Sequence, residues 1–146
     1  MEVKVRLACS KEEFFKILIE SILYDIKQAT GHQLELEKLK KGYTYQKQLY
    51  GHKNKKLAEI TIDEFIYPQC YALTFKTSKG INVARYTLCE SDDEHIMVIY
   101  QEQFKSHRLV WLNQLFASMT NKQQIKSKKA MFKNMESYII NNRNKL

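Results

Sequence analysis

The fold is decided by a stretch of alternating residues in the middle of the chain, LAEITIDEFI at residues 57–66. Apolar side chains alternate here with polar ones, Ala58, Ile60 and Ile62 against Glu59, Thr61 and Asp63. A period of two is typical of a β-strand with one face buried and the other in water. Glu64 continues the parity of Ile60 and Ile62, so we expect its carboxylate on the apolar face.

Strand-like stretches lie on both sides of this one. They cover residues 43–50, 71–77, 81–89 and 96–104, with Pro68 and an acidic loop at 90–94 among the breaks. The links are about two to six residues long, which is hairpin length, so consecutive strands are predicted to pair antiparallel. Residues 2–8 alternate in the same way and add a sixth strand.

Helical periodicity lies before and after the five central strands. Ser10 and Glu13 have the spacing of a capping box, and Gly31 marks the end of the helical stretch that follows them. One long helix and two short helices with a bend between them both fit this stretch. A second helical pattern runs through residues 109–139.

This order of elements predicts an α+β protein. An amphipathic antiparallel sheet leaves one apolar face open, and the apolar stripe of the last helix can cover it. We therefore expect a helix-grip fold over 1–146 as a single domain. A twisted six-stranded sheet would wrap around the long C-terminal helix, with a helical segment between strands 1 and 2. The sheet is wider than the helix, so a cavity between them is expected.

Six motifs carry a resemblance that covers nearly the whole chain. They are Ser10–Glu13, SILYDI at 21–26, ATG at 29–31, AEITIDE at 58–64, YQE at 100–102 and the basic C-terminal helix from Lys122. Together with the element order, they resemble an uncharacterised bacterial domain family within or near the START / polyketide-cyclase-like (SRPBCC) superfamily of helix-grip folds. The resemblance implies a cavity for apolar or amphipathic ligands such as lipids, sterols and polyketides. The superfamily also includes enzymes and protein-binding modules, and its fuller members have seven strands where six are counted here.

Composition excludes several classes of protein. With 44% hydrophobic residues, four Gly and one Pro, the chain is not collagen-like, low-complexity or largely disordered. No apolar run approaches the roughly 18–20 residues of a membrane-spanning helix, and the N-terminus lacks a signal-peptide core, so a cytoplasmic protein is expected. Cys9, Cys70 and Cys89 lack metal-site spacing and are expected to be buried free thiols. We expect no metal and no cofactor.

The net charge of +8 is concentrated in residues 38–56 and 122–146. Such basic stretches attract phosphate groups, although they also occur as ordinary solvated surface. Lys outnumbers Arg by 20 to 4, and Arg is the better ligand of phosphate, which argues against nucleic acid as the partner.

Aromatic residues of the strands, with a few polar and apolar companions, are the candidate lining of the cavity. The full set is Tyr45, Ile62, Glu64, Tyr71, Phe75, Arg85, Tyr86, Tyr100, Glu102, Trp111, Phe116 and Met119. Aromatic rings offer contact area and hydroxyl groups offer orientation, but the same side chains also form ordinary cores. Glu102 shares the parity of Tyr100 and so can point toward the helix, with Arg85 or a tyrosine hydroxyl as its partner. The alternative, favoured for both Glu102 and Glu64, is a carboxylate near the strand end in water or in a structural ion pair. The stretch around Trp111 fits packing on the sheet, a lid or a membrane contact.

Three functions remain open at this point. The first is a non-catalytic module that binds a small apolar or amphipathic molecule between the sheet and the last helix. The second is an interaction protein whose basic helix and 38–56 region meet an anionic surface, nucleic acid or an acidic protein. The third, ranked last because no catalytic constellation supports it, is a cyclase- or hydrolase-like enzyme using Glu102 or Glu64 as acid or base. Monomer and homodimer both fit the sequence.

Overall fold

The structure is a computed structural model that describes residues 1–49, 56–106 and 110–143; the side chains of residues 56, 106 and 110–121 lie outside the described part. The elements follow the predicted order: β1 (Glu2–Leu7), α1 (Lys11–Thr30), a 3-10 turn η1 (Leu36–Lys38), β2 (Thr44–Leu49), β3 (Lys56–Ile66), β4 (Cys70–Thr77), β5 (Gly80–Asp92), β6 (His95–Ser106) and α2 (Val110–Asn142). Within the described ranges, neither helix has an apolar stretch long enough to cross a membrane.

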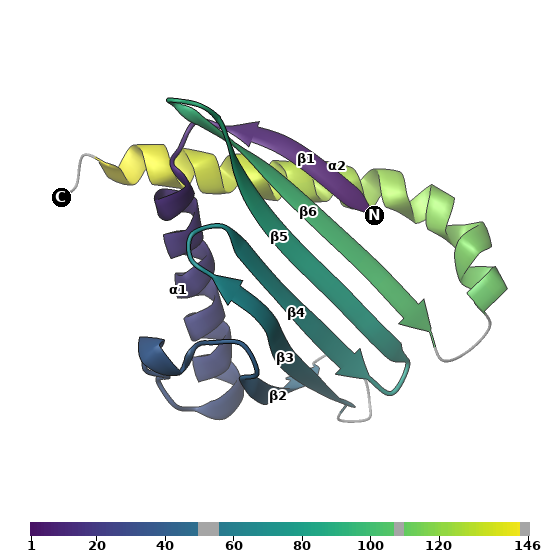
Figure 1. The fold of residues 1–146 in the computed structure, drawn as a ribbon. Helices are drawn as coiled ribbons and strands as arrows, with labels where there is room; N and C mark the ends of the chain where they lie inside the picture. Colours follow the sequence, from purple (N-terminus) through teal and green to yellow (C-terminus); the bar gives the residue numbers. More distant parts are fainter. Residues whose placement is uncertain (50–55, 107–109, 144–146) are drawn as a thin grey trace.

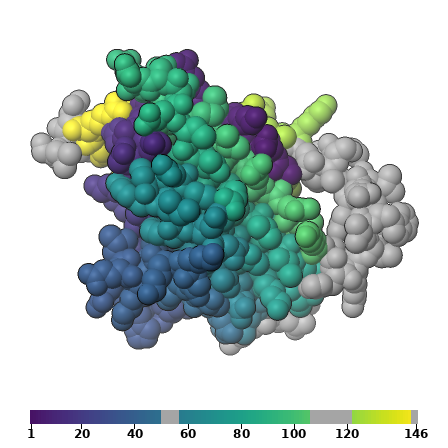
Figure 2. Space-filling view, in the orientation of Figure 1, coloured from purple at the N-terminus to yellow at the C-terminus, as the bar shows by residue number. Residues whose placement is uncertain are grey.

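The six strands form one antiparallel sheet in the order β1-β6-β5-β4-β3-β2. Each of β2 to β6 pairs with its neighbour in sequence, as hairpin-length links require, and β1 returns to pair with β6. Both helices lie on the same side of the sheet (Figure 1). The strands form the near surface in Figure 2, where the yellow end of α2 shows only at the margin. The predicted α+β helix-grip architecture is confirmed.

Helix α1 is a single helix of 20 residues, so the alternative of two short helices is wrong. The predicted capping box is present: Ser10 Oγ accepts from the Glu13 amide at 3.0 Å, and the Glu13 carboxylate accepts from the Ser10 amide at 3.0 Å. Gly31 ends the helix at φ 77°, a left-handed conformation that glycine adopts without strain. The buried face is apolar and consists of Phe14, Phe15, Leu18, Ile22 and Ile26.

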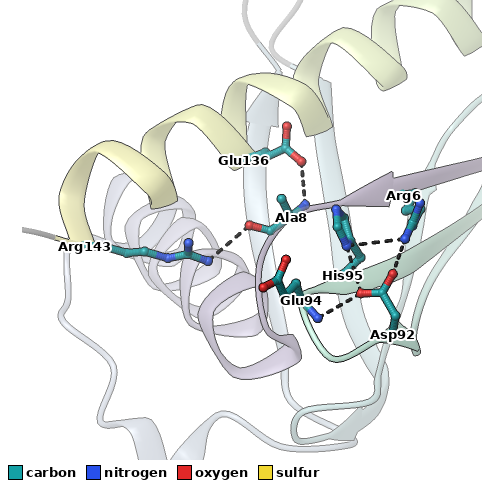
Figure 3. Close-up of polar contacts among 7 residues, drawn as sticks. All are labelled: Arg6, Ala8, Asp92, Glu94, His95, Glu136 and Arg143. Carbon is teal, nitrogen blue, oxygen red and sulfur yellow. Dashed lines mark hydrogen bonds and ion pairs between the residues drawn. The ribbon is translucent and has the colours of Figure 1, made fainter.

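Helix α2 spans 33 residues and contacts β1, β6 and α1. Phe132 is fully buried, and Ile139 is 6% exposed seven residues further along the same face. The C-terminal part of the helix is tied to the end of β1 by polar contacts (Figure 3). The amide of Ala8 donates to Glu136 at 2.6 Å, and Arg143 Nη2 donates to the Ala8 carbonyl at 3.1 Å. Lys133 Nζ donates to the Arg6 carbonyl at 3.2 Å.

The carboxylate of Glu13 joins the start of α1 to the end of α2. Besides capping Ser10, it accepts from Arg143 Nε at 2.8 Å and from Arg143 Nη2 at 2.9 Å. These hydrogen bonds from Arg143 are the main cause that lowers the pKa of Glu13 to about 2, from an ordinary value of 4.5.

Glu13→Gln is expected to lower the free energy of unfolding by about 1 kcal/mol at pH 7, because the amide keeps the cap but not the ion pair, which is partly exposed to solvent. The pKa is lower in the folded than in the unfolded protein. The stabilisation is therefore complete above about pH 4.5 and disappears as the pH falls towards 2. Urea unfolding of both proteins at pH 7 and pH 2.5 measures this, with the exposed neighbour Glu12→Gln as the control. An equal difference at both pH values would show that the ion pair contributes nothing.

Two expectations about the end of β5 are wrong. The stretch 90–94 was expected to be a loop, but β5 continues to Asp92 and β6 starts at His95. The turn between these two strands therefore consists of Asp93 and Glu94 alone. Cys89 is exposed, whereas Cys9 and Cys70 are buried. Extended pairing across the hairpin holds residues 90–92 in the strand, which their acidic composition does not predict.

Candidate functional site

The helices pack on one face of the sheet, which we call the inner face. Near the middle of α2, aromatic rings fill the space between this face and the helix. Tyr71, Tyr86 and Tyr100 pair across three adjacent strands, with ring centroids 5.9 Å and 4.8 Å apart. The ring of Phe132 lies 6.2 Å from that of Tyr86 and 6.0 Å from that of Tyr100. Burial raises the pKa of Tyr86 to about 12, so its hydroxyl stays protonated. These three tyrosines, expected to line a cavity, pack against one another here, and Tyr86 and Tyr100 also pack against Phe132 of the helix.

The same face is more open towards the other end of β4, β5 and β6. Phe75, Asn82 and Phe104 form one row across the three strands, and Leu73, Ala84 and Glu102 form the next. Four of these side chains are half-buried, Leu73, Phe75, Asn82 and Glu102, and Phe104 is 53% exposed. This end of the inner face therefore offers apolar surface that solvent reaches.

Glu102 is the centre of a polar cluster at the boundary between the closed and the open part. Its Oε2 accepts from the Tyr100 hydroxyl at 2.7 Å, and its Oε1 accepts from Asn82 Nδ2 at 2.6 Å. Burial, and then the bond to Glu102, raise the pKa of Tyr100, which fixes its hydroxyl as a donor. Lys128 Nζ stands 4.4 Å from the centre of the Tyr100 ring, a cation–π contact. The expectation of a tyrosine partner for Glu102 is confirmed.

Asn82 is a site residue that the sequence analysis missed. A carboxylate can only accept, so Asn82 must present its NH2 group to Glu102, and this fixes the orientation of the amide. The amide oxygen Oδ1 is buried and has no hydrogen-bond partner within the described structure. A buried acceptor left unpaired costs about 1–3 kcal/mol. The spacing of two from Ala84 and Tyr86 could have placed Asn82 on this face.

Glu64 and Arg85 lie on the outer face, so the expectation that Glu64 shares a face with Ile60 and Ile62 is wrong. The register of β3 against β4 shifts between Ile62 and Glu64. This β-bulge reverses the alternation beyond it. Arg85, which was one of the possible partners of Glu102, forms an ion pair with Glu64 instead and also donates to Cys70 Sγ at 3.1 Å. The Cys70 thiol is 3.4 Å from Glu64, and burial raises its pKa.

Two other predicted site residues belong to the core. Ile62 is fully buried. The Tyr45 hydroxyl donates to Asp25 of α1 at 2.6 Å, and Lys47 forms an ion pair with the same carboxylate. Burial and the bond to Asp25 raise the pKa of Tyr45. Trp111, Phe116 and Met119 fall within α2, but their side chains lie outside the described residues.

A pocket of about 880 Å³ lies elsewhere, between the start of α1, the β5–β6 hairpin and Arg143. Its lining is largely charged, and several of its groups pair with one another or with nearby side chains. Asp92 forms an ion pair with Arg6 and accepts from the Glu94 amide at 2.9 Å and from His95 at 2.8 Å (Figure 3). These hydrogen bonds lower the pKa of Asp92. Such a lining does not suit an apolar ligand, and no metal-binding group of His, Cys, Asp and Glu is found among the described residues.

The basic C-terminal helix presents its lysines to solvent. Those at helical spacing along one side are Lys122, Lys126, Lys129 and Lys133, all exposed. In the 38–56 region, Lys38, Lys40 and Lys41 are exposed, whereas 50–55 lie outside the described part. The exposure fits a solvated surface as well as an anionic partner, so it favours neither.

A six-stranded antiparallel sheet that holds a long C-terminal helix defines a helix-grip protein. A family described as "Domain of unknown function (DUF3284)" matches residues 1–121, and the chain belongs to this family. A comparison with curated proteins found no match.

Solved structures share the fold at low sequence identity. Ara h 8.0201 is 13% identical, with 97% of each chain covered and a TM-score of 0.62. A conserved protein from Geobacillus kaustophilus is 16% identical, covering 97% of this chain and 95% of that one, with a TM-score of 0.57. TTHA0849 from Thermus thermophilus is 10% identical, covering 98% of this chain and 99% of that one, with a TM-score of 0.58. The structural similarity, at 10–16% sequence identity, shows the fold and not the function.

Proposed function

We propose that the protein binds a small apolar or amphipathic molecule against the inner face of β4, β5 and β6. The observation that carries the proposal is the open end of this face, where Phe75 and Phe104 flank Asn82. Phe104 keeps 53% of its surface exposed, and together with the half-buried Phe75 and Leu73 it forms a contiguous apolar surface on one face of the sheet. An apolar floor with a few convergent polar groups is the usual composition of a small-molecule site.

The polar cluster supports binding rather than acid–base catalysis. Both oxygens of Glu102 already accept hydrogen bonds, from Asn82 and from Tyr100. The raised pKa of Tyr100 keeps its proton in place, whereas a general acid or base works best with a pKa near the operating pH. The cluster is therefore suited to orient a ligand.

Titration with Nile red, a neutral apolar dye that fluoresces in apolar surroundings, tests the proposal. We expect saturable binding to the wild-type protein and about tenfold weaker binding to Phe104→Ser, because half of an aromatic ring no longer contacts the dye. Val83→Ser is the matched control, since Val83 is 37% exposed and lies on the outer face of the adjacent strand. Absence of saturable binding, or equal weakening by both substitutions, would refute the proposal.

A further inference from the structure

We infer that the ligand carries a hydrogen-bond donor, a hydroxyl or an ammonium group, as its polar end, and that Asn82 Oδ1 and the Glu102 carboxylate receive it. The inference rests on the proposed function and specifies the chemical class of the molecule bound there.

The orientation of the Asn82 amide is the first support. Its only donor group faces Glu102 Oε1 at 2.6 Å, and the acceptor Oδ1 is left buried without a partner in the described structure. Exchanging the amide oxygen and nitrogen would place an oxygen against a carboxylate oxygen, so the protein itself cannot satisfy Oδ1 by this route. A donor from a bound ligand can do so once the side chains that cover this buried atom move aside.

The second support is that acceptors dominate the cluster. Tyr100 donates its hydroxyl hydrogen to Glu102 and Asn82 donates one of its two amide hydrogens, and each carboxylate oxygen can accept a further hydrogen bond. Lys128 makes its contact with the ring of Tyr100, and no ion pair between Lys128 and Glu102 is present among the described side chains. A ligand with a carboxylate would bring like charge towards Glu102, whereas a hydroxyl or ammonium group would complete the cluster.

The third support is the position of Asn82 between two aromatic side chains. Asn82 pairs with Phe75 of β4 on one side and with Phe104 of β6 on the other. A molecule whose apolar body lies on these rings therefore has its polar end beside Oδ1. The expected ligand is an amphipath with an apolar body and a donor at one end.

Four probes of matched length test this by displacement of Nile red: decan-1-ol, decylamine, decanoate and 1-methoxynonane, an ether with the size of the alcohol but no donor. We expect decan-1-ol or decylamine to bind about tenfold more tightly than 1-methoxynonane, and decanoate to bind most weakly. Tighter binding of decylamine than of decan-1-ol would identify the negatively charged Glu102 carboxylate as the main acceptor of the ligand. Tighter binding of decan-1-ol would identify Asn82 Oδ1 as the main acceptor.

Asn82→Leu should weaken the preference for decan-1-ol over 1-methoxynonane while keeping the affinity for 1-methoxynonane, because Oδ1 is then lost as an acceptor. Gln103→Leu is the matched control, because Gln103 is an exposed amide on the outer face of the neighbouring strand. Equal binding of all four probes to the wild-type protein, or tightest binding of decanoate, would overturn the inference and leave the proposed function standing. Failure of Nile red itself to bind would instead refute the proposed function. The selectivity of the wild-type protein decides the matter even if Asn82→Leu does not fold.

Discussion

Phe132→Ala is expected to lower the free energy of unfolding by about 3–5 kcal/mol. Phe132 is fully buried, and its ring lies 6.0 Å from Phe14, 6.2 Å from Tyr86 and 6.0 Å from Tyr100. It thus joins α2 to α1 and to the tyrosines of the sheet. Alanine would leave a cavity among rigid rings that cannot collapse into it, which places the cost towards the upper end of the range.

Urea unfolding followed by circular dichroism measures this effect. Met131→Ala is the control on the same helix, since Met131 is 37% exposed and its truncation should cost less than about 1 kcal/mol. Phe132→Leu retains much of the volume, so a measurable intermediate loss is expected even if the alanine variant does not fold. Equal effects of Phe132→Ala and Met131→Ala would contradict the packing of α2 on the tyrosine cluster.

Asp25→Ala should destabilise the protein by about 2 kcal/mol, because it leaves the buried Tyr45 hydroxyl without its acceptor. Tyr45 is 8% exposed, and the ion pair of Asp25 with Lys47 is more open to water, with the Lys47 side chain 37% exposed. The hydroxyl bond therefore contributes most of the effect, and Lys47→Gln should cost less than about 1 kcal/mol.

A double-mutant cycle with Tyr45→Phe isolates the hydroxyl bond. Removal of both partners is expected to cost about 1–2 kcal/mol less than the sum of the single losses, because no unpaired polar group is then buried. Strict additivity in urea unfolding would show that Asp25 and Tyr45 do not interact, and the Asp25–Lys47 ion pair would then be the polar contact that holds Asp25 of α1 against β2.

The order of elements and the two caps of α1 were predictable because they depend on short-range patterns. The alternation of Val3, Val5 and Leu7 and the spacing of Ser10 and Glu13 each encode a local conformation. The helix-grip arrangement then follows, since the apolar face of the sheet has only the helices to cover it. The partner of β1 was not predicted, because its pairing with β6 joins residues almost a hundred positions apart.

The candidate site was predicted less well, and the β-bulge at Asp63 is one reason. One additional residue moves Glu64 to the outer face and gives its place to Phe65, and nothing in the sequence of β3 marks the extra residue. Arg85 forms an ion pair with Glu64 on that face. The separation of Arg85 from Glu102 has another cause, the regular alternation of β5 and β6: Arg85 lies opposite Gln101 on the outer face, whereas Glu102 lies opposite Ala84 on the inner face, where it contacts Asn82 and Tyr100.

The contacts of α2 with the end of β1 have a consequence for self-association. An edge strand with free amides and carbonyls is a template on which a second chain can add a strand. Here the last three turns of a helix more than a hundred residues away occupy the Ala8 amide and carbonyl and the Arg6 carbonyl. Cleavage or fraying that removes those turns would therefore free these three backbone groups for pairing with a strand of another chain.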